Sequence, residues 1–142
     1  MKSKALALLT ATTFLATLGL ATQASAQITQ DQITTFDAGP NGTIPTSINP
    51  SGEIAGYYFG STEPTAHGFV RDKDGTITSF DAPGAGPNGT IVVGINPNGE
   101  IAGYFYDPNY VVNHTTHGFV RDRNGTIVSF DAPNAGTDGT VS

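Results

Sequence analysis

The sequence has no cysteine and no tryptophan, and it has only one methionine. Without cysteine the chain has neither a disulfide nor a thiolate metal ligand, so packing and hydrogen bonds alone must hold its fold. Basic residues are also scarce, because 6 Lys and Arg stand against 12 Asp and Glu. An acidic surface repels phosphate backbones and anionic lipid headgroups, which argues against nucleic acid or a membrane surface as a partner.

The one long apolar stretch lies at the N-terminus. Two lysines precede the apolar segment 5–20, which threonines interrupt, and residues 24–26 (Ala-Ser-Ala) have the form that signal peptidase cleaves. A membrane span needs about 20 uninterrupted apolar residues, so we expect residues 1–26 to be a cleaved secretory signal. The mature chain, 27–142, would then have no membrane anchor and would be periplasmic or extracellular.

Glycine and proline are abundant, at 18 and 9 residues, and they recur at equivalent places in a repeated block. The block begins with Phe-Asp-Ala, continues through Asn-Pro-x-Gly-Glu-Ile-Ala-Gly-Tyr and ends with His-Gly-Phe-Val-Arg-Asp. Its first Phe recurs at Phe36, Phe80 and Phe130, a period typical of propeller blades and other repeat arrays. The repeat therefore predicts three units in the mature chain: a first of about 33–76, a second of about 77–126 and a partial third at 127–142.

The second unit shows which elements a unit should contain. Thr90–Ile95 is rich in β-branched residues, and residues 100–105 resume an extended pattern after an Asn-Pro-Asn-Gly turn, which predicts a hairpin. Residues 117–122 and 126–130 flank Asn124-Gly125, which predicts a second hairpin with a primed two-residue turn. No segment has a sustained helical period. The pattern predicts an all-β fold of four-stranded, propeller-like blades, partial and open; a small β-sandwich or a β-solenoid is the alternative.

Two motifs carry a family resemblance. Ile-Asn-Pro-x-Gly stands at residues 48–52 and 95–99, and His-Gly-Phe-Val stands at residues 67–70 and 117–120. With these motifs the chain resembles the bacterial extracellular repeats of the HAF family over nearly all of residues 33–142, although glycine follows the histidine where the family's name implies alanine. The resemblance implies a secreted, propeller-like repeat protein, and it implies no particular activity.

Acidic residues and histidines recur with the block. Asp37, Asp81 and Asp131 follow the three phenylalanines, and each could serve as an acid, a base or a calcium ligand. We expect them instead to cap turns through their side-chain oxygens. His67 and His117 also recur, and we interpret them as structural residues in a hydrogen-bond network within each blade. The sequence therefore predicts no catalytic residue, no metal site and no cofactor.

Two loops vary in length between the units, whereas the tight turns do not. The loop after Phe-Asp-Ala and the loop before the His motif are each three residues longer in the second unit. Variable loops on a rigid scaffold are where binding residues concentrate. All five tyrosines lie on the strand before the second loop or within that loop. We interpret Tyr57 and Tyr104 as packing residues, and Tyr106 and Tyr110 as candidates for ligand binding.

These observations favour a secreted, non-catalytic binding or scaffold module whose ligand is a glycan or a peptide. A fragment of a carbohydrate-active enzyme and a purely structural component of a surface array are the alternatives. Propellers close with about four to eight blades, so two units and part of a third also predict self-association or partial disorder at both ends of the chain.

Overall fold

The computed structural model describes residues 33–61 and 64–133. The chain divides into two compact units, residues 1–34 and 35–142, and only Ile33 and Thr34 of the first are described. The predicted signal sequence and the predicted third unit beyond residue 133 therefore lie outside the described residues. No helix in the described part of the chain has the length and hydropathy needed to cross a membrane.

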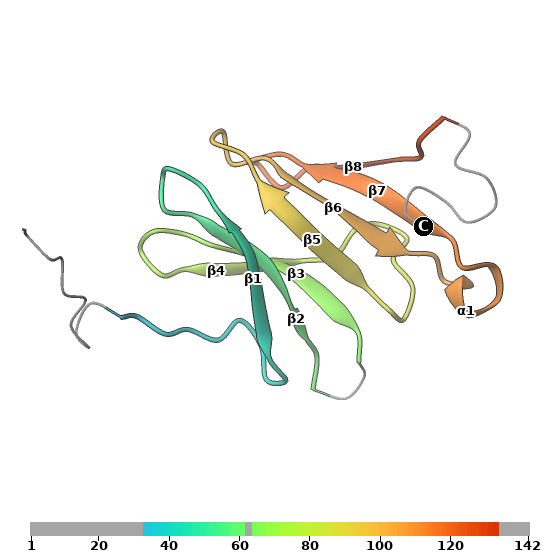
Figure 1. Cartoon of the computed structure of the whole chain (residues 1–142), viewed down its shortest axis with the longest axis horizontal. Helices are drawn as coiled ribbons and strands as arrows, with labels where there is room; N and C mark the ends of the chain where they lie inside the picture. The colour runs from blue at the N-terminus through green and yellow to red at the C-terminus, as the bar shows by residue number, and fades with distance from the viewer. Residues whose placement is uncertain (1–32, 62–63, 134–142) are drawn as a thin grey trace, which may run out of the picture. The chain divides into compact units, whose positions relative to one another are not determined.

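The second unit is all-β, as predicted, and contains two four-stranded antiparallel sheets that remain open (Figure 1). The first sheet, which we call blade 1, contains β1 (Thr43–Ile48), β2 (Ile54–Phe59), β3 (Ala66–Arg71) and β4 (Ile77–Phe80). The second sheet, blade 2, contains β5 (Thr90–Ile95), β6 (Ile101–Tyr106), β7 (Thr116–Arg121) and β8 (Ile127–Phe130). Each strand pairs with the next along the chain, so both blades are simple meanders.

The strands of blade 2 lie within one residue of the predicted ones, and β5 matches its prediction in full. The boundaries of the predicted repeat units nevertheless differ from the boundaries of the sheets by one strand. β4 falls in the predicted second unit, 77–126, but it pairs with β3 and so belongs to blade 1. The sequence also missed a helical turn, α1 (Tyr110–Asn113), because four residues are too few to show a helical period.

The asparagine of the Asn-Pro-x-Gly-Glu motif forms hydrogen bonds within the motif. Oδ1 of Asn49 accepts hydrogen bonds from the backbone N–H groups of Ser51 and Glu53, both at 3.0 Å. Its Nδ2 donates to Oε2 of Glu53 at 2.6 Å. Asn96 and Glu100 make the same side-chain bond in blade 2, also at 2.6 Å. The recurring glutamate therefore completes a side-chain clamp around the turn.

The Asn124-Gly125 turn is not the predicted primed turn. Gly125 has a φ of 95°, whereas Asn124 is not among the described residues with positive φ, and a type I′ turn needs positive φ at both central residues. The N–H of Gly125 donates instead to the carbonyl of Asp122 at 3.0 Å. The Asp122 carboxylate then accepts a hydrogen bond from the N–H of Thr126 at 2.7 Å, which stabilises the wider loop.

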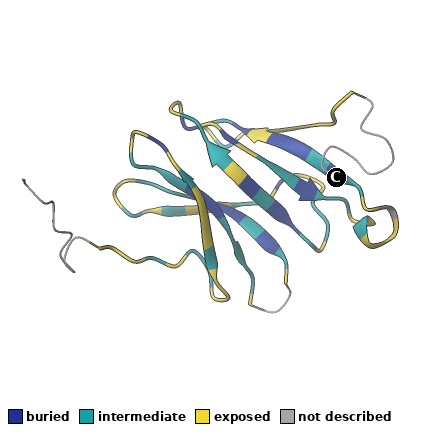
Figure 2. Ribbon diagram, viewed as in Figure 1, coloured by how far each residue is buried: buried dark blue, intermediate teal, exposed yellow. Residues whose placement is uncertain are grey.

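The hydrophobic core lies where the two blades meet. β5 contacts β1, β2 and β3 of blade 1, and Figure 2 shows buried positions concentrated in the central strands. The buried residues of this core come from both sides of the junction: Ala55 and Ala82 on one, and Val92, Ile101, Phe105 and Phe119 on the other. The core is thus an interface between consecutive blades.

The phenylalanine of Phe-Asp-Ala links each blade to the segment before it. The Phe80 ring meets the ring of Phe119 edge-on at 6.1 Å, and the Arg121 guanidinium lies 4.9 Å from its centre. Phe36 repeats this arrangement on blade 1, where its ring lies 5.9 Å from Phe69 and 5.0 Å from the guanidinium of Arg71. Each blade therefore holds a phenylalanine from the preceding segment between its own phenylalanine and arginine.

An ion pair also joins the blades. Nη2 of Arg123 lies 2.5 Å from Oε1 of Glu53. The hydrogen bond from Asn49 and the nearby guanidinium of Arg123 together lower the pKa of Glu53 below its ordinary value of 4.5. The charged form of Glu53 is therefore favoured in the folded protein.

This lowered pKa predicts a loss of stability in acid. The contribution of Glu53 is complete above pH 4.5, its unfolded pKa, and is lost as the pH falls through the lower folded value. Glu53→Gln should remove this part of the pH dependence and cost at most about 1 kcal/mol of unfolding free energy at neutral pH. Urea unfolding at neutral and acidic pH measures both effects. Glu100→Gln is the matched control, because Glu100 has no arginine partner among the described residues; an equal effect of the two substitutions would contradict the assignment.

Candidate functional site

An aromatic pocket of about 330 Å³ lies near the start of β5, where the blades meet. Both blades and both variable loops contribute to it. We call it the tyrosine pocket and define it by Tyr57, Phe59, Asn88, Ile91, Tyr104, Tyr106 and Tyr110. The two tyrosines that the sequence proposed for ligand binding therefore lie in one pocket. Tyr57 and Tyr104, interpreted from sequence only as packing residues, line the same pocket.

The rings of the tyrosine pocket meet edge to face. Tyr106 and Tyr110 have centroids 4.5 Å apart with an interplanar angle of 70°, and Tyr104 lies 5.7 Å from Tyr106 at 77°. On blade 1, Tyr57 and Phe59 lie 5.9 Å apart at 90°. At these angles the ring faces form the walls of the pocket and meet at corners. Edge-to-face contacts of this kind are themselves favourable.

The hydroxyl of Tyr106 is a stable hydrogen-bonding group. Burial raises its pKa above the ordinary value of 10.0, and its hydrogen bond with Tyr104 raises it further. The phenol therefore stays protonated across the physiological range and remains able to donate a hydrogen bond.

The longer loop of blade 2 positions Tyr110 through α1. The Asp107 carboxylate accepts a hydrogen bond from the N–H of Asn109 at 2.7 Å, and the Asp107 carbonyl accepts one from the N–H of Tyr110 at 2.9 Å. His114 ends the turn with a φ of 54°, and its ring lies 5.5 Å from that of Tyr110. The longer loop thus contains a short helix that places an aromatic ring against Tyr106.

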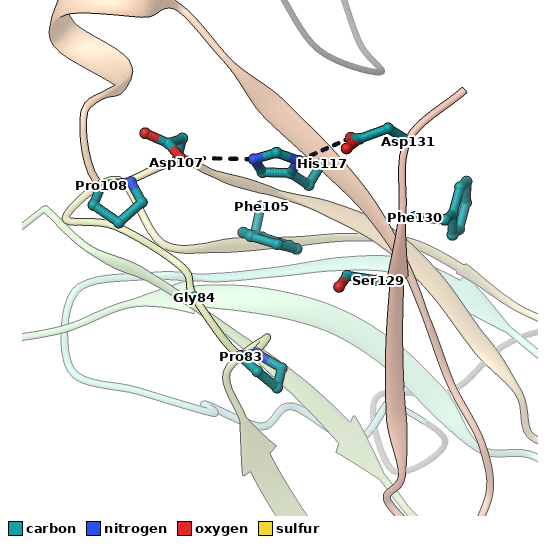
Figure 3. A pocket seen from close by; sticks show the side chains of 9 residues that line it. All are labelled: Pro83, Gly84, Phe105, Asp107, Pro108, His117, Ser129, Phe130 and Asp131. Carbon is teal, nitrogen blue, oxygen red and sulfur yellow. Dashed lines mark hydrogen bonds and ion pairs between the residues drawn. The ribbon is translucent and has the colours of Figure 1, made fainter. Parts of the chain in front are cut away.

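A second pocket, of about 480 Å³, lies beside β7 and β8 and contains a histidine between two carboxylates (Figure 3). Nδ1 of His117 lies 2.8 Å from Oδ1 of Asp131, and its Nε2 lies 3.7 Å from Oδ2 of Asp107. The imidazole also stacks on Phe105, with centroids 5.1 Å apart. No hydrogen bond joins Ser129, which lines this pocket, to His117 within the described residues, so a Ser-His pair for nucleophilic catalysis is not assembled there.

The Asp-His pair is a feature of both blades. In blade 1, Nδ1 of His67 lies 2.9 Å from Oδ1 of Asp81, and the ring packs on Tyr58 at 5.3 Å. Asp81 and Asp131 thus each have an imidazole of the same blade as a partner, a contact that the sequence interpretation did not anticipate. The spacing of 14 residues is the same in both units, and that constancy was the signal that could have revealed the pair. Asp37, the first aspartate of the series, is exposed.

Blade 1 does not reproduce the complete second pocket. Asp107 stands directly after β6, and Gly60 occupies the matching place after β2. Within the described residues, no group of three or more His, Cys, Asp or Glu side chains is arranged to hold a metal ion. The carboxylates of this pocket are instead directed at one imidazole.

Comparison with models of protein families gives no match, and comparisons with curated proteins and with solved structures give no significant match. The resemblance to HAF repeats therefore stays a prediction.

Proposed function

We propose that the chain is a secreted, non-catalytic binding module whose tyrosine pocket holds a saccharide ring. The observation that carries this proposal is the convergence of aromatic rings from both blades on one pocket at the variable loops. Its volume, about 330 Å³, lies at the lower end of the range of small-molecule sites. A pyranose ring presents apolar faces that stack on tyrosine, and its hydroxyls can bond to the Tyr106 phenol and the Asn88 amide.

The chemistry of the lining favours a neutral sugar over a peptide. No charged side chain is among the described residues that line the tyrosine pocket, so it offers no partner for the charged groups of a peptide. Proline-rich peptides bind along aromatic-lined grooves, whereas the rings here meet at 70° to 90° and form corners. A compact ring fits such a corner better than an extended chain does.

The same lining supports binding without hydrolysis. Glycosidases commonly use two carboxyl groups that flank the scissile bond, and no carboxylate lines the tyrosine pocket within the described residues. Asp81 and Asp131, the recurrent acidic candidates, each pair with a histidine of their own blade. These contacts favour a structural role for the two aspartates over an acid-base role.

A glycan array followed by titration calorimetry tests the proposal. We expect the full chain to bind neutral oligosaccharides and Tyr110→Ala to weaken binding about tenfold or more, since an aromatic anchor of this kind contributes about 1.4 kcal/mol or more. Tyr106→Ala should act in the same direction, with a further loss because it also removes the phenol hydroxyl.

Val111→Ala is the matched control, because Val111 lies on α1 beside Tyr110 but is 83% exposed. Its affinity should equal that of the wild type. Binding to peptides with no glycan bound would overturn the saccharide assignment, and equal losses in Tyr110→Ala and Val111→Ala would overturn the pocket assignment.

A further inference from the structure

The far side of blade 2 matches the side of blade 1 that blade 2 covers. Ala55 is fully buried at the junction of the blades, whereas Ala102, at the same place in the repeat, is exposed. Val70 packs against the core, whereas its counterpart Val120 is 39% exposed. Blade 2 therefore presents to its surroundings the apolar surface that blade 1 uses for docking the next blade.

This far side is also hollowed. A depression of about 400 Å³ is lined by Gly94, Ile95, Asn96, Glu100, Ile101, Ala102 and Val120. At the junction within the chain, the matching surface of blade 1 is covered by β5, whose Val92 is buried. The strand that corresponds to β5 in blade 1 is β1, and exposed Pro45 stands there at the place of Val92. The edge strand β1 of blade 1 therefore corresponds to β5, the strand that covers the matching surface at the junction within the chain.

The polar contacts of the junction have counterparts on the two outer surfaces. Glu53 of blade 1 pairs with Arg123 of blade 2. Glu100 takes the place of Glu53 on blade 2 and is exposed, and Lys73 takes the place of Arg123 on blade 1 and is also exposed. A second copy placed against the far side of blade 2 would bring its Lys73 to Glu100 with the correct pairing of charges.

We propose that the far side of blade 2 docks blade 1 of a second copy of this chain, so that copies stack head to tail as the two blades stack within one chain. The occupant is a second copy because the established junction between the blades is the template for this contact. Head-to-tail contacts form closed rings when the rotation between copies allows it. Propellers close with about four to eight blades, so a ring built from the two described blades of each copy would contain two to four copies.

In such a stack, two phenylalanines would compete for the same site on blade 1. Phe36 occupies, on blade 1, the place of a phenylalanine from a preceding blade, and Phe130 of the neighbouring copy has the matching place in the repeat. Residues 35–37 belong to no strand, and Ala38 next to them donates a hydrogen bond to Oγ1 of Thr43 at 2.8 Å. We therefore expect docking to displace the Phe36 segment, which competes with the second copy.

This inference does not rest on the proposed function, and we expect docking to cover the tyrosine pocket only in part. Tyr57 and Phe59 stay only partly buried with blade 2 in place. Tyr104 and Tyr106 hold the same positions on blade 2, and a second copy would cover them to a similar extent. Loss of association and loss of sugar binding are therefore separable results.

Multi-angle light scattering of the full chain over a range of concentrations tests the proposal. We expect a single assembled mass of two to four chains that gives way to monomer on dilution. Ala102→Arg should weaken association at least tenfold without lowering the melting temperature, since Ala102 is exposed in the single chain. Val111→Arg, at an exposed position that does not line this depression, is the control and should assemble as the wild type does. A monomer at every concentration, or normal assembly of Ala102→Arg, would overturn the proposal.

Further variants test two details of the contact, the charge pair and the Phe36 segment. Glu100→Lys and Lys73→Glu should each weaken association, and the double variant should recover most of the loss because the charge pair is restored in reverse. Phe36→Ala should strengthen association, since it removes the competitor. Combining it with Ala102→Arg should abolish that gain; if the combined variant still associates, the gain comes from non-specific exposure and the proposal is wrong.

Discussion

Replacing Phe119 with alanine is expected to lower the free energy of unfolding by about 3–5 kcal/mol. The side chain is fully buried at the junction of the blades, where it meets Phe80 edge-on. A Cβ on Gly103 would lie 2.7 Å from the Phe119 ring, so the ring packs directly against the backbone of β6. Its removal would leave a cavity that flanking backbone cannot fill. Urea unfolding followed by circular dichroism measures the loss.

Phe130→Ala provides the comparison for this prediction. Phe130 ends β8 as Phe80 ends β4, but it is 50% exposed, and partial burial predicts a loss of less than about half that of Phe119→Ala. Domains of this size are stable by about 5–15 kcal/mol, so the Phe119 variant should unfold at clearly lower denaturant concentration. Equal losses in the two variants would show that the core is not centred on the junction between the blades.

Replacing Gly89 with alanine is expected to cost about 3 kcal/mol or more, from backbone strain and a steric clash together. Gly89 has a φ of 81°, and a Cβ at this position would lie 2.0 Å from the carbonyl oxygen of Ala66. The two residues form an isolated parallel bridge between the blades, so the clash is with backbone that cannot move without opening the junction. A thermal or urea melt of the variant measures the cost.

Gly42→Ala isolates the contribution of the clash. Gly42 stands at the same place in blade 1 and also has positive φ, 106°, but a Cβ there would meet nothing within 4 Å. The two substitutions share the backbone strain, so the excess loss in Gly89→Ala, about 2 kcal/mol, reports contact between blades. If Gly42→Ala proves as destabilising as Gly89→Ala, the close approach of Gly89 to Ala66 is not what constrains this glycine.

The strands could be predicted from sequence because their signals are local. Thr90–Ile95 is rich in β-branched residues and is bounded by turn residues, and the glycines of the tight turns adopt positive φ. The Asn124-Gly125 turn was wrong in detail, because Asp122 bonds to the N–H of Thr126 and favours a wider loop. That bond depends on a side chain outside the dipeptide from which the turn was predicted.

Contacts between the two blades could not be predicted from the sequence in the same way. The repeat marked Phe80 as important, but its place against Phe119 follows from how blade 2 stacks on blade 1. The changing loop lengths did direct attention to Tyr106 and Tyr110, and both line the tyrosine pocket. Tyr57 lines it as well, because the stacking of the blades brings a residue of β2 close to the loop that contains Asn88. Pairwise alternation along one strand contains no information about such a neighbour.

The most direct test of the tyrosine pocket as a saccharide site is an NMR titration of the isotopically labelled chain with a panel of neutral oligosaccharides. We predict that the amide signals of Asn88, Ile91 and Tyr104 to Tyr110 shift in a saturable way, and that the Asn88 side-chain amide shifts with them. Signals that stay fixed throughout the panel, or that shift only around His117 and Asp131, would contradict the assignment of this pocket to sugar binding.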